Sequence, residues 1–172
     1  MKTIAYIILI STLPFFFSCK KENTTIKEND DTATSTNTVD YNVQKNTLLQ
    51  LVNNVRKSGC KCGSTDMPAV PAVTWNDLLA KAAFEHSKEM EANKNFSHTG
   101  INGSNPGDRI TKAGYSWTSY GENIANGYPS EEAVITGWLN SEGHCKNIMS
   151  ASVKEMGAGR QANYWTQEFA SK

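Results

Sequence analysis

The change of hydrophobic period near the C-terminus constrains the fold of this chain more than any other feature. Apolar residues recur with helical spacing over most of the sequence after residue 45, whereas the last part alternates. Over residues 164–169 a strand would place Trp165, Gln167 and Phe169 on one face. With residues 156–159 this segment predicts a β-hairpin. Helices followed by late strands favour an α+β fold, or helices layered on both faces of a sheet.

Four helices are predicted before the hairpin, and their ends carry recognisable signals. They are expected over residues 48–59, 76–92, 105–114 and 130–143. Asn76 and Ser130 are good N-caps because their side chains can accept hydrogen bonds from free N–H groups. Gly59 and Gly143 are expected to end the first and the fourth helix.

Length and charge define the broad class of protein. The chain has 172 residues, with 17 Lys and Arg against 17 Asp and Glu. That length suits one domain. A net charge of zero gives no basic footprint, so nucleic acid is not an expected partner.

The N-terminus is interpreted as an export signal. Lys2 precedes an apolar run from Ile4 to Phe17, which is shorter than the roughly 20 residues that span a bilayer. The run ends in Phe16-Phe17-Ser18-Cys19, which resembles a bacterial lipoprotein cleavage box. Cys19 is therefore predicted to become the lipidated first residue and to attach the protein to a membrane. A plain secretory signal cleaved nearby is the alternative.

The predicted organisation has three parts. Residues 1–18 form the signal peptide, residues 19–40 a polar tether, and residues 41–172 the folded domain. The tether holds too little apolar surface to offset its ordering entropy, although it could instead be a frayed arm of the domain. The expected location is the bacterial cell envelope, as a lipoprotein on the periplasmic face or at the cell surface.

Two of the three histidines, with one glutamate, are candidates for chemistry. His98 follows the second predicted helix and His144 the fourth, while Glu122 lies in Gly121-Glu122-Asn123-Ile124-Ala125. They could form a metal site, for which imidazole suits Zn or Cu, or an acid–base cluster. His86 falls on the apolar face of the second helix and is interpreted as a hydrogen-bonded core residue.

The ordered set of segments resembles the CAP superfamily (cysteine-rich secretory proteins, antigen 5 and pathogenesis-related proteins), also called SCP domains, in its bacterial form. The resemblance covers about residues 46–170. It rests on Ala83-Phe84-Glu85-His86-Ser87, Phe96-Ser97-His98, Asp108-Arg109-Ile110, Ala113-Gly114-Tyr115, Gly121-Glu122-Asn123-Ile124-Ala125, Trp138-Leu139-Asn140-Ser141, Gly143-His144, Asn147-Ile148-Met149 and Tyr164-Trp165-Thr166-Gln167.

The resemblance implies a single-domain, three-layer α-β-α sandwich with a central cleft lined by two histidines and two acidic residues. Carried over, the histidines are His98 and His144, and the first acid is Glu122. The family position of the second acid holds Ser141, and Glu142 comes one residue later. One residue turns a helix by about 100°, so Glu142 need not point into the cleft.

The same side chains allow three uses of the cleft. His98 and His144 could bind Zn or another divalent cation with water completing the shell, although no cofactor is required. Alternatively, the imidazoles and Glu122 form a hydrogen-bond network that closes the cleft floor. The third use is hydrolysis, for which no catalytic residue is assigned because a triad depends on spatial geometry.

Export makes a disulfide plausible, and the predicted bridge joins Cys62 to Cys145, with Cys60 as the alternative to Cys62. Such a loop would constrain the unfolded chain by roughly 4 to 5 kcal/mol in the entropy model. The other hypothesis is a thiolate metal site that uses all three cysteines, with or without His144.

The four tryptophans are expected in the core and the cleft wall, and Arg109 as a structural helix cation. The favoured function is an exported, lipid-anchored binding protein for a small-molecule, lipid or peptide ligand, with enzyme activity less favoured. The alternatives are a metal-assisted or His/Glu hydrolase acting in the cell envelope and a purely structural envelope protein.

Overall fold

The computed structural model describes residues 40–172. The predicted signal peptide, the predicted lipidation site Cys19 and nearly all of the predicted tether therefore lie outside the described residues. Within residues 40–172, no helix is both long enough and apolar enough to cross a membrane.

The first two helices confirm the sequence prediction. Helix α1 (Lys45–Ser58) buries Leu48 and Val52 and ends at Gly59, whose φ of 72° lies in the left-handed region that favours glycine. Helix α2 (Asp77–Asn93) begins after Asn76, whose side chain accepts hydrogen bonds from the backbone N–H groups of Leu78 and Leu79. Helix α3 (Pro106–Lys112) is opened by a capping box between Asn105 and Asp108.

The predicted fourth helix is wrong in one respect, because it is two helices. Helix α4 (Glu131–Leu139) begins after Ser130, as expected, but ends before Ser141. Ser141 has an extended backbone, with φ −104° and ψ 120°, and helix α5 (Glu142–Ile148) starts beyond it. Gly143 and His144 therefore lie inside α5 rather than past a helix end.

The sheet contains more strands than the hairpin that the sequence predicts. Strands β3 (Thr74–Trp75), β5 (Glu155–Gln161), β6 (Tyr164–Ser171) and β4 (Ser119–Asn126) form it in that spatial order. The β5–β6 hairpin was expected, and β4 pairs antiparallel with β6 over its whole length. The β3–β5 pair is parallel. A separate hairpin joins β1 (Cys60–Cys62) to β2 (Thr65–Met67).

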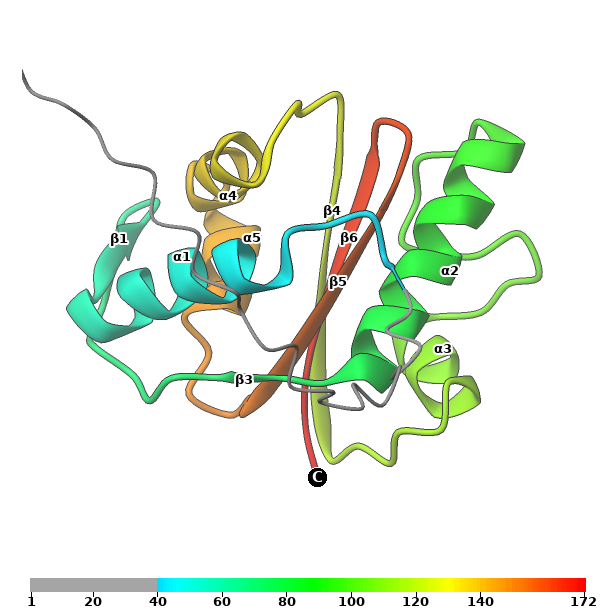
Figure 1. Cartoon of the computed structure of the whole chain (residues 1–172). Coiled ribbons are helices and arrows are strands. Elements are labelled where there is room, and N and C mark those ends of the chain that lie inside the picture. Colours follow the sequence, from blue (N-terminus) through cyan, green and yellow to red (C-terminus); the bar gives the residue numbers. More distant parts are fainter. Residues whose placement is uncertain (1–39) are drawn as a thin grey trace, which may run out of the picture. The chain divides into compact units, whose positions relative to one another are not determined.

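Helices cover both faces of the four-stranded sheet (Figure 1). Helices α1, α4 and α5 lie on one side, and α2 and α3 on the other. The fold is a single α+β domain with helices packed on a mixed sheet, as predicted.

Two glycines on β5 allow α2 to approach the sheet closely. A Cβ at Gly157 would overlap the backbone of Ala80, and one at Gly159 would come within 2.5 Å of the Cα of Phe84. Both contacts involve backbone atoms that cannot move without displacing α2. The lack of a side chain at these two glycines therefore allows α2 to lie directly over β5 and β6.

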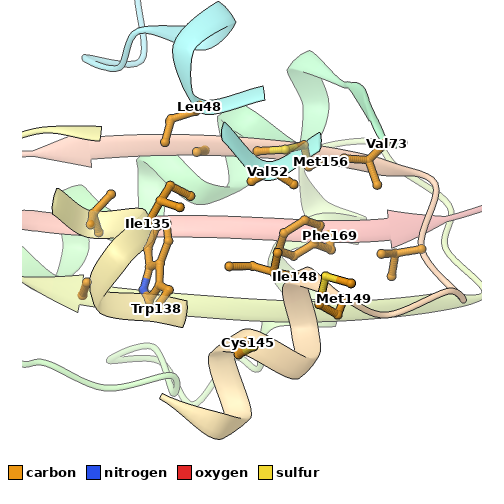
Figure 2. Packing of buried hydrophobic residues seen from close by; sticks show 14 of the residues in the cluster. Leu48, Val52, Val73, Ile135, Trp138, Cys145, Ile148, Met149, Met156 and Phe169 are labelled. Atoms are coloured by element: carbon orange, nitrogen blue, oxygen red, sulfur yellow. The ribbon is translucent and has the colours of Figure 1, made fainter. Parts of the chain in front are cut away.

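The larger apolar core lies under α1, α4 and α5 (Figure 2). Its sheet side includes Met156, Trp165 and Phe169, each fully buried. Trp138 of α4 is also buried, and its indole N–H donates to the carbonyl of Ile124. Among the other tryptophans, Trp117 is 39% exposed, so not all of them serve the core as predicted.

Two cross-connections hold this side of the molecule together. The Cys62–Cys145 disulfide joins the β1–β2 hairpin to α5, in agreement with the predicted pairing. Arg56 of α1 is fully buried, and its guanidinium donates to the carbonyls of Pro71, Ile148 and Ser150. A buried cation with several carbonyl acceptors satisfies loops that would otherwise bury unpaired polar groups.

Candidate functional site

Glu122 is the centre of the candidate site. It lies on β4, an edge strand of the sheet, and its side chain is only 2% exposed. Strand alternation turns it toward the α2 and α3 side, since its neighbour Asn123 bonds with Gln167 and with Asn147 of α5. Sequence reasoning placed this glutamate in a motif without assigning it to a strand.

Both oxygens of Glu122 are engaged by neighbouring side chains. His98 Nδ1 lies 2.6 Å from Oε1, and Arg109 Nη2 lies 2.5 Å from Oε2. Burial is the largest single influence on the pKa of Glu122 and raises it, but hydrogen bonding to His98 and the positive charge of Arg109 contribute to a net lowering. The carboxylate is therefore ionised, and His98 must carry its proton on Nδ1 in order to donate to it.

Arg109 has a larger role than the structural helix cation that the sequence suggested. Its guanidinium also donates to the backbone carbonyls of Ser104 and His98. It thus fixes the main chain of His98 while binding the carboxylate that holds the imidazole. One cation positions both partners of the His98–Glu122 pair.

A second acid, Glu168, lies directly across the strand pair from Glu122. It is fully buried, and neither of its oxygens has a hydrogen-bond partner among the described residues. Burial, followed by the charge of Glu122, raises the pKa of Glu168 well above its ordinary value. The raised pKa favours the protonated form of Glu168, because two like charges this close cannot both be held in a buried site.

His144 approaches the same region from the other side of the sheet edge. It lies on α5, and the backbone carbonyl of His144 accepts a hydrogen bond from Asn123 of β4. Partial burial lowers the pKa of His144, and the charge of nearby His98 lowers it further. The two imidazoles are therefore electrostatic neighbours, although they come from opposite layers.

His98 is the exposed member of the group. Its side chain is 51% exposed, and Nδ1 is committed to Glu122. The loop that carries it is tied to α2 by His86, whose Nε2 lies 2.9 Å from the carbonyl oxygen of Ser97. His86 is 1% exposed, which confirms its interpretation as a hydrogen-bonded core residue.

Glu142, the remaining predicted cleft residue, is placed elsewhere. Its carboxylate pairs with Lys146 at 2.6 Å on the same helix and lies against Gly63 of the β1–β2 turn. The structure thus joins His98 to Glu122, leaves His144 linked to them by the charge of His98, and gives Glu142 different neighbours. The second acid beside Glu122 is Glu168.

Among residues 40–172, no preformed three-ligand site includes the histidines. One group of three His, Cys, Asp or Glu residues in this part of the chain has all its ligand atoms within 4.8 Å, and it consists of Cys60, Cys62 and Cys145. A pocket of about 540 Å³ opens between α2 and α3. Arg109 and His86 line it, but His98, Glu122 and His144 do not.

Sequence reasoning missed Glu168 and the role of Arg109. Glu168 lies between Gln167 and Phe169 in a segment predicted to be a strand. A charged residue within such a strand is a signal that could have marked it as a candidate site residue. Nothing in the local sequence near Arg109 indicates a partner 13 positions away on another element.

Most of the described chain matches a known family. Residues 49–169 match the model of the family described as "CAP: Cysteine-rich secretory protein family". An "Uncharacterized membrane protein YlbC" of Bacillus subtilis (strain 168) is 36% identical over 98 residues, which is 57% of this chain and 28% of that protein. This chain therefore spans less than a third of that relative's length.

Two solved structures are also similar. An extracellular protein containing a SCP domain from Bacillus anthracis str. Ames has a TM-score of 0.62 at 29% identity, over 74% of this chain and 41% of that chain. An outer surface protein from Borrelia burgdorferi has a TM-score of 0.63 at 22% identity, over 74% and 91% of the two chains. The second likeness is one of fold alone.

Proposed function

Since the chain belongs to the cysteine-rich secretory protein (CAP) family, we propose that it is an exported binding protein whose His98–His144 pair takes a divalent cation such as Zn²⁺. One observation carries the proposal. The bond between His98 Nδ1 and Glu122 leaves the other ring nitrogen of His98 free, on a half-exposed side chain whose charge lowers the pKa of His144.

The donor set suits such an ion. A carboxylate that accepts the Nδ1–H of a histidine fixes the ring and raises its basicity at Nε2, an arrangement common behind zinc ligands. Glu122 serves in this supporting position because Arg109 already occupies its second oxygen. Two imidazoles leave the remaining coordination positions to water or to a ligand that the ion would hold.

Calorimetric titration of the oxidised chain with Zn²⁺ tests the proposal. We expect one binding event, which His98→Ala and His144→Ala each weaken by at least about tenfold. Glu142→Gln is the matched control, because its carboxylate pairs with Lys146 and should not affect the titration. Absence of binding in the wild type, or equal loss in the control, would refute the cation site.

The pH dependence gives a second measurement. Zinc binds neutral imidazole, so its affinity should fall as the histidines become protonated. Because the pKa of His144 is lowered, this ligand should stay neutral below the pH at which an ordinary histidine becomes charged. A titration in which affinity does not change between neutral and acidic pH would exclude imidazole ligands.

The His98–Glu122 contact also favours a second function, hydrolysis. A histidine held at 2.6 Å by a carboxylate can act as a general base if a water or hydroxyl lies within reach of its other nitrogen. A screen of peptide and ester substrates with His98→Ala as the control separates the two functions. Turnover that disappears in this variant would support the hydrolase.

Location at the cell exterior, with lipid attachment at Cys19, completes the proposal. Its support is the leader sequence and the similarity to a SCP-domain protein described as extracellular. Expression of the full chain should give a membrane-associated, acylated product, and Cys19→Ala should release it unacylated. Mass spectrometry of the mature N-terminus distinguishes acylation from plain secretion.

A further inference from the structure

Three sulfur atoms meet where the β1–β2 hairpin contacts α5. Cys60 and Cys62 are two residues apart on β1, so strand alternation places both side chains on one face. Cys145 comes from α5 and forms the disulfide with Cys62. Cys60 remains a free thiol, with Sγ 3.6 Å from that of Cys145 and 3.9 Å from that of Cys62.

The position of the free thiol does not suit exchange with the disulfide. Exchange requires the attacking sulfur to lie roughly in line with the bond that breaks, so its two distances should differ by the length of a disulfide, about 2 Å. The distances from Cys60 Sγ are 3.6 and 3.9 Å. Cys60 therefore lies beside the bond, and the sulfurs form a triangle rather than a line.

That triangle has the dimensions of a thiolate metal site. Tetrahedral zinc with Zn–S bonds of about 2.3 Å places its sulfur ligands about 3.8 Å apart. Both distances from Cys60 lie close to this value. Opening the disulfide allows the third distance, between Cys62 and Cys145, to relax toward it, because their Cα atoms are 5.4 Å apart.

We infer that reduction converts this cluster into a Zn²⁺ site with Cys60, Cys62 and Cys145 as ligands and one open position. A thiol or dithiol reductant supplies two electrons and two protons to the Cys62–Cys145 bond and is itself oxidised to a disulfide. The three thiols then lose three protons to solvent as three Zn–S bonds form. Thiolate sulfur is the donor that zinc and copper(I) select in proteins.

A bound dication deprotonates a coordinating thiol outright, so Cys60, a free thiol here, can serve as a ligand. This cluster is separate from the His98–His144 pair, and its function does not depend on theirs.

Cobalt(II) is a suitable probe because thiolate ligands give it charge-transfer absorption and intense visible bands. The full chain is reduced with a phosphine, freed of metal and titrated with Co²⁺, which Zn²⁺ then displaces. We expect one equivalent to produce a tetrahedral thiolate spectrum, while Co²⁺ on the separate His98–His144 pair adds no thiolate bands. Cys60→Ser should weaken binding by more than about 100-fold, since it removes a direct ligand. His98→Ala should leave the thiolate spectrum unchanged.

Circular dichroism keeps the test decisive if reduction unfolds the chain. In that case Zn²⁺ should restore the folded spectrum of the wild type but not of Cys60→Ser. A reduced chain that stays folded without thiolate bands would overturn the inference. So would a reduced chain that unfolds and does not refold with Zn²⁺, or a Cys60→Ser variant that binds like the wild type.

Discussion

The two faces of the central sheet are built from alternate residues of the same strands but have different chemistry. On the face under α1, α4 and α5, β6 contributes Trp165 and Phe169 to the larger apolar core. On the opposite face the same strand contributes Thr166 and Glu168, both fully buried. Glu122 of β4 lies across from Glu168.

The apolar face of the sheet contributes mainly to stability, whereas the polar face carries the candidate functional site. The apolar face gains free energy from area removed from water, which is not directional. The polar face buries two carboxyls, Arg109 and His86, and a buried charge needs a partner. Its stability therefore depends on pH and on single hydrogen bonds, whereas that of the apolar face does not.

The largest effect is expected on the apolar face. Trp165→Ala should lower the free energy of unfolding by about 3 to 5 kcal/mol, because the side chain is fully buried and leaves a cavity. Denaturant unfolding at two pH values measures it, and the loss should be the same at both. Phe96→Ala, at a side chain 51% exposed, should cost less than about 1 kcal/mol. A loss for Trp165→Ala that varies with pH would break the comparison.

A somewhat smaller decrease in the free energy of unfolding is expected when Arg109 is removed from the polar face. Arg109→Met should destabilise the chain by about 3 kcal/mol at neutral pH, since Glu122 would remain as a buried charge without its guanidinium partner. Adding Glu122→Gln should recover part of the loss. A double-mutant cycle measures the coupling, and strictly additive losses would show that the pair is not coupled.

The pH dependence of Glu168 sharpens the comparison further. Its pKa is raised in the native state, so above the ordinary value of 4.5 the native carboxyl keeps a proton that the unfolded chain has lost. Stability should therefore fall as pH rises through that window, by at most about 1.4 kcal/mol per pH unit for one proton.

Glu168→Gln should remove this fall, because an amide of the same size cannot ionise. The variant should match the wild type near pH 4 and become relatively more stable toward neutral pH. Unfolding curves over that range measure the difference. Equal slopes in the two proteins would mean that Glu168 is already ionised in the native state.

The smallest change in the free energy of unfolding is expected for substitution of Cys60 under oxidising conditions. Cys60→Ser should change the free energy of unfolding by less than about 0.5 kcal/mol, because the disulfide does not involve this residue. Thermal unfolding of the oxidised proteins checks this. A large loss would give Cys60 a packing role in addition to its position beside the two bonded sulfurs.

The local sequence was sufficient for most of the elements. The apolar stripe of α1, the caps at Asn76 and Ser130, and the alternation in β6 each depend on neighbours within a few residues. The break at Ser141 was not predictable in this way. Gly143 looked like a helix end, but the chain extends two residues earlier and a new helix includes the glycine.

The sequence by itself determined the α+β class, the helix starts and the candidacy of His98, Glu122 and His144, and it narrowed the partner of Cys145 to two neighbouring cysteines. Only the tertiary structure decided that Arg109 and Glu168 complete the environment of Glu122, that Glu142 pairs with Lys146 and that Cys60 lies beside the disulfide. The physical reason is that the two kinds of interaction act over different distances along the chain. Capping and periodicity act within a turn or a strand, whereas the charge of a buried carboxyl is set by whichever side chains the packing of distant elements places around it.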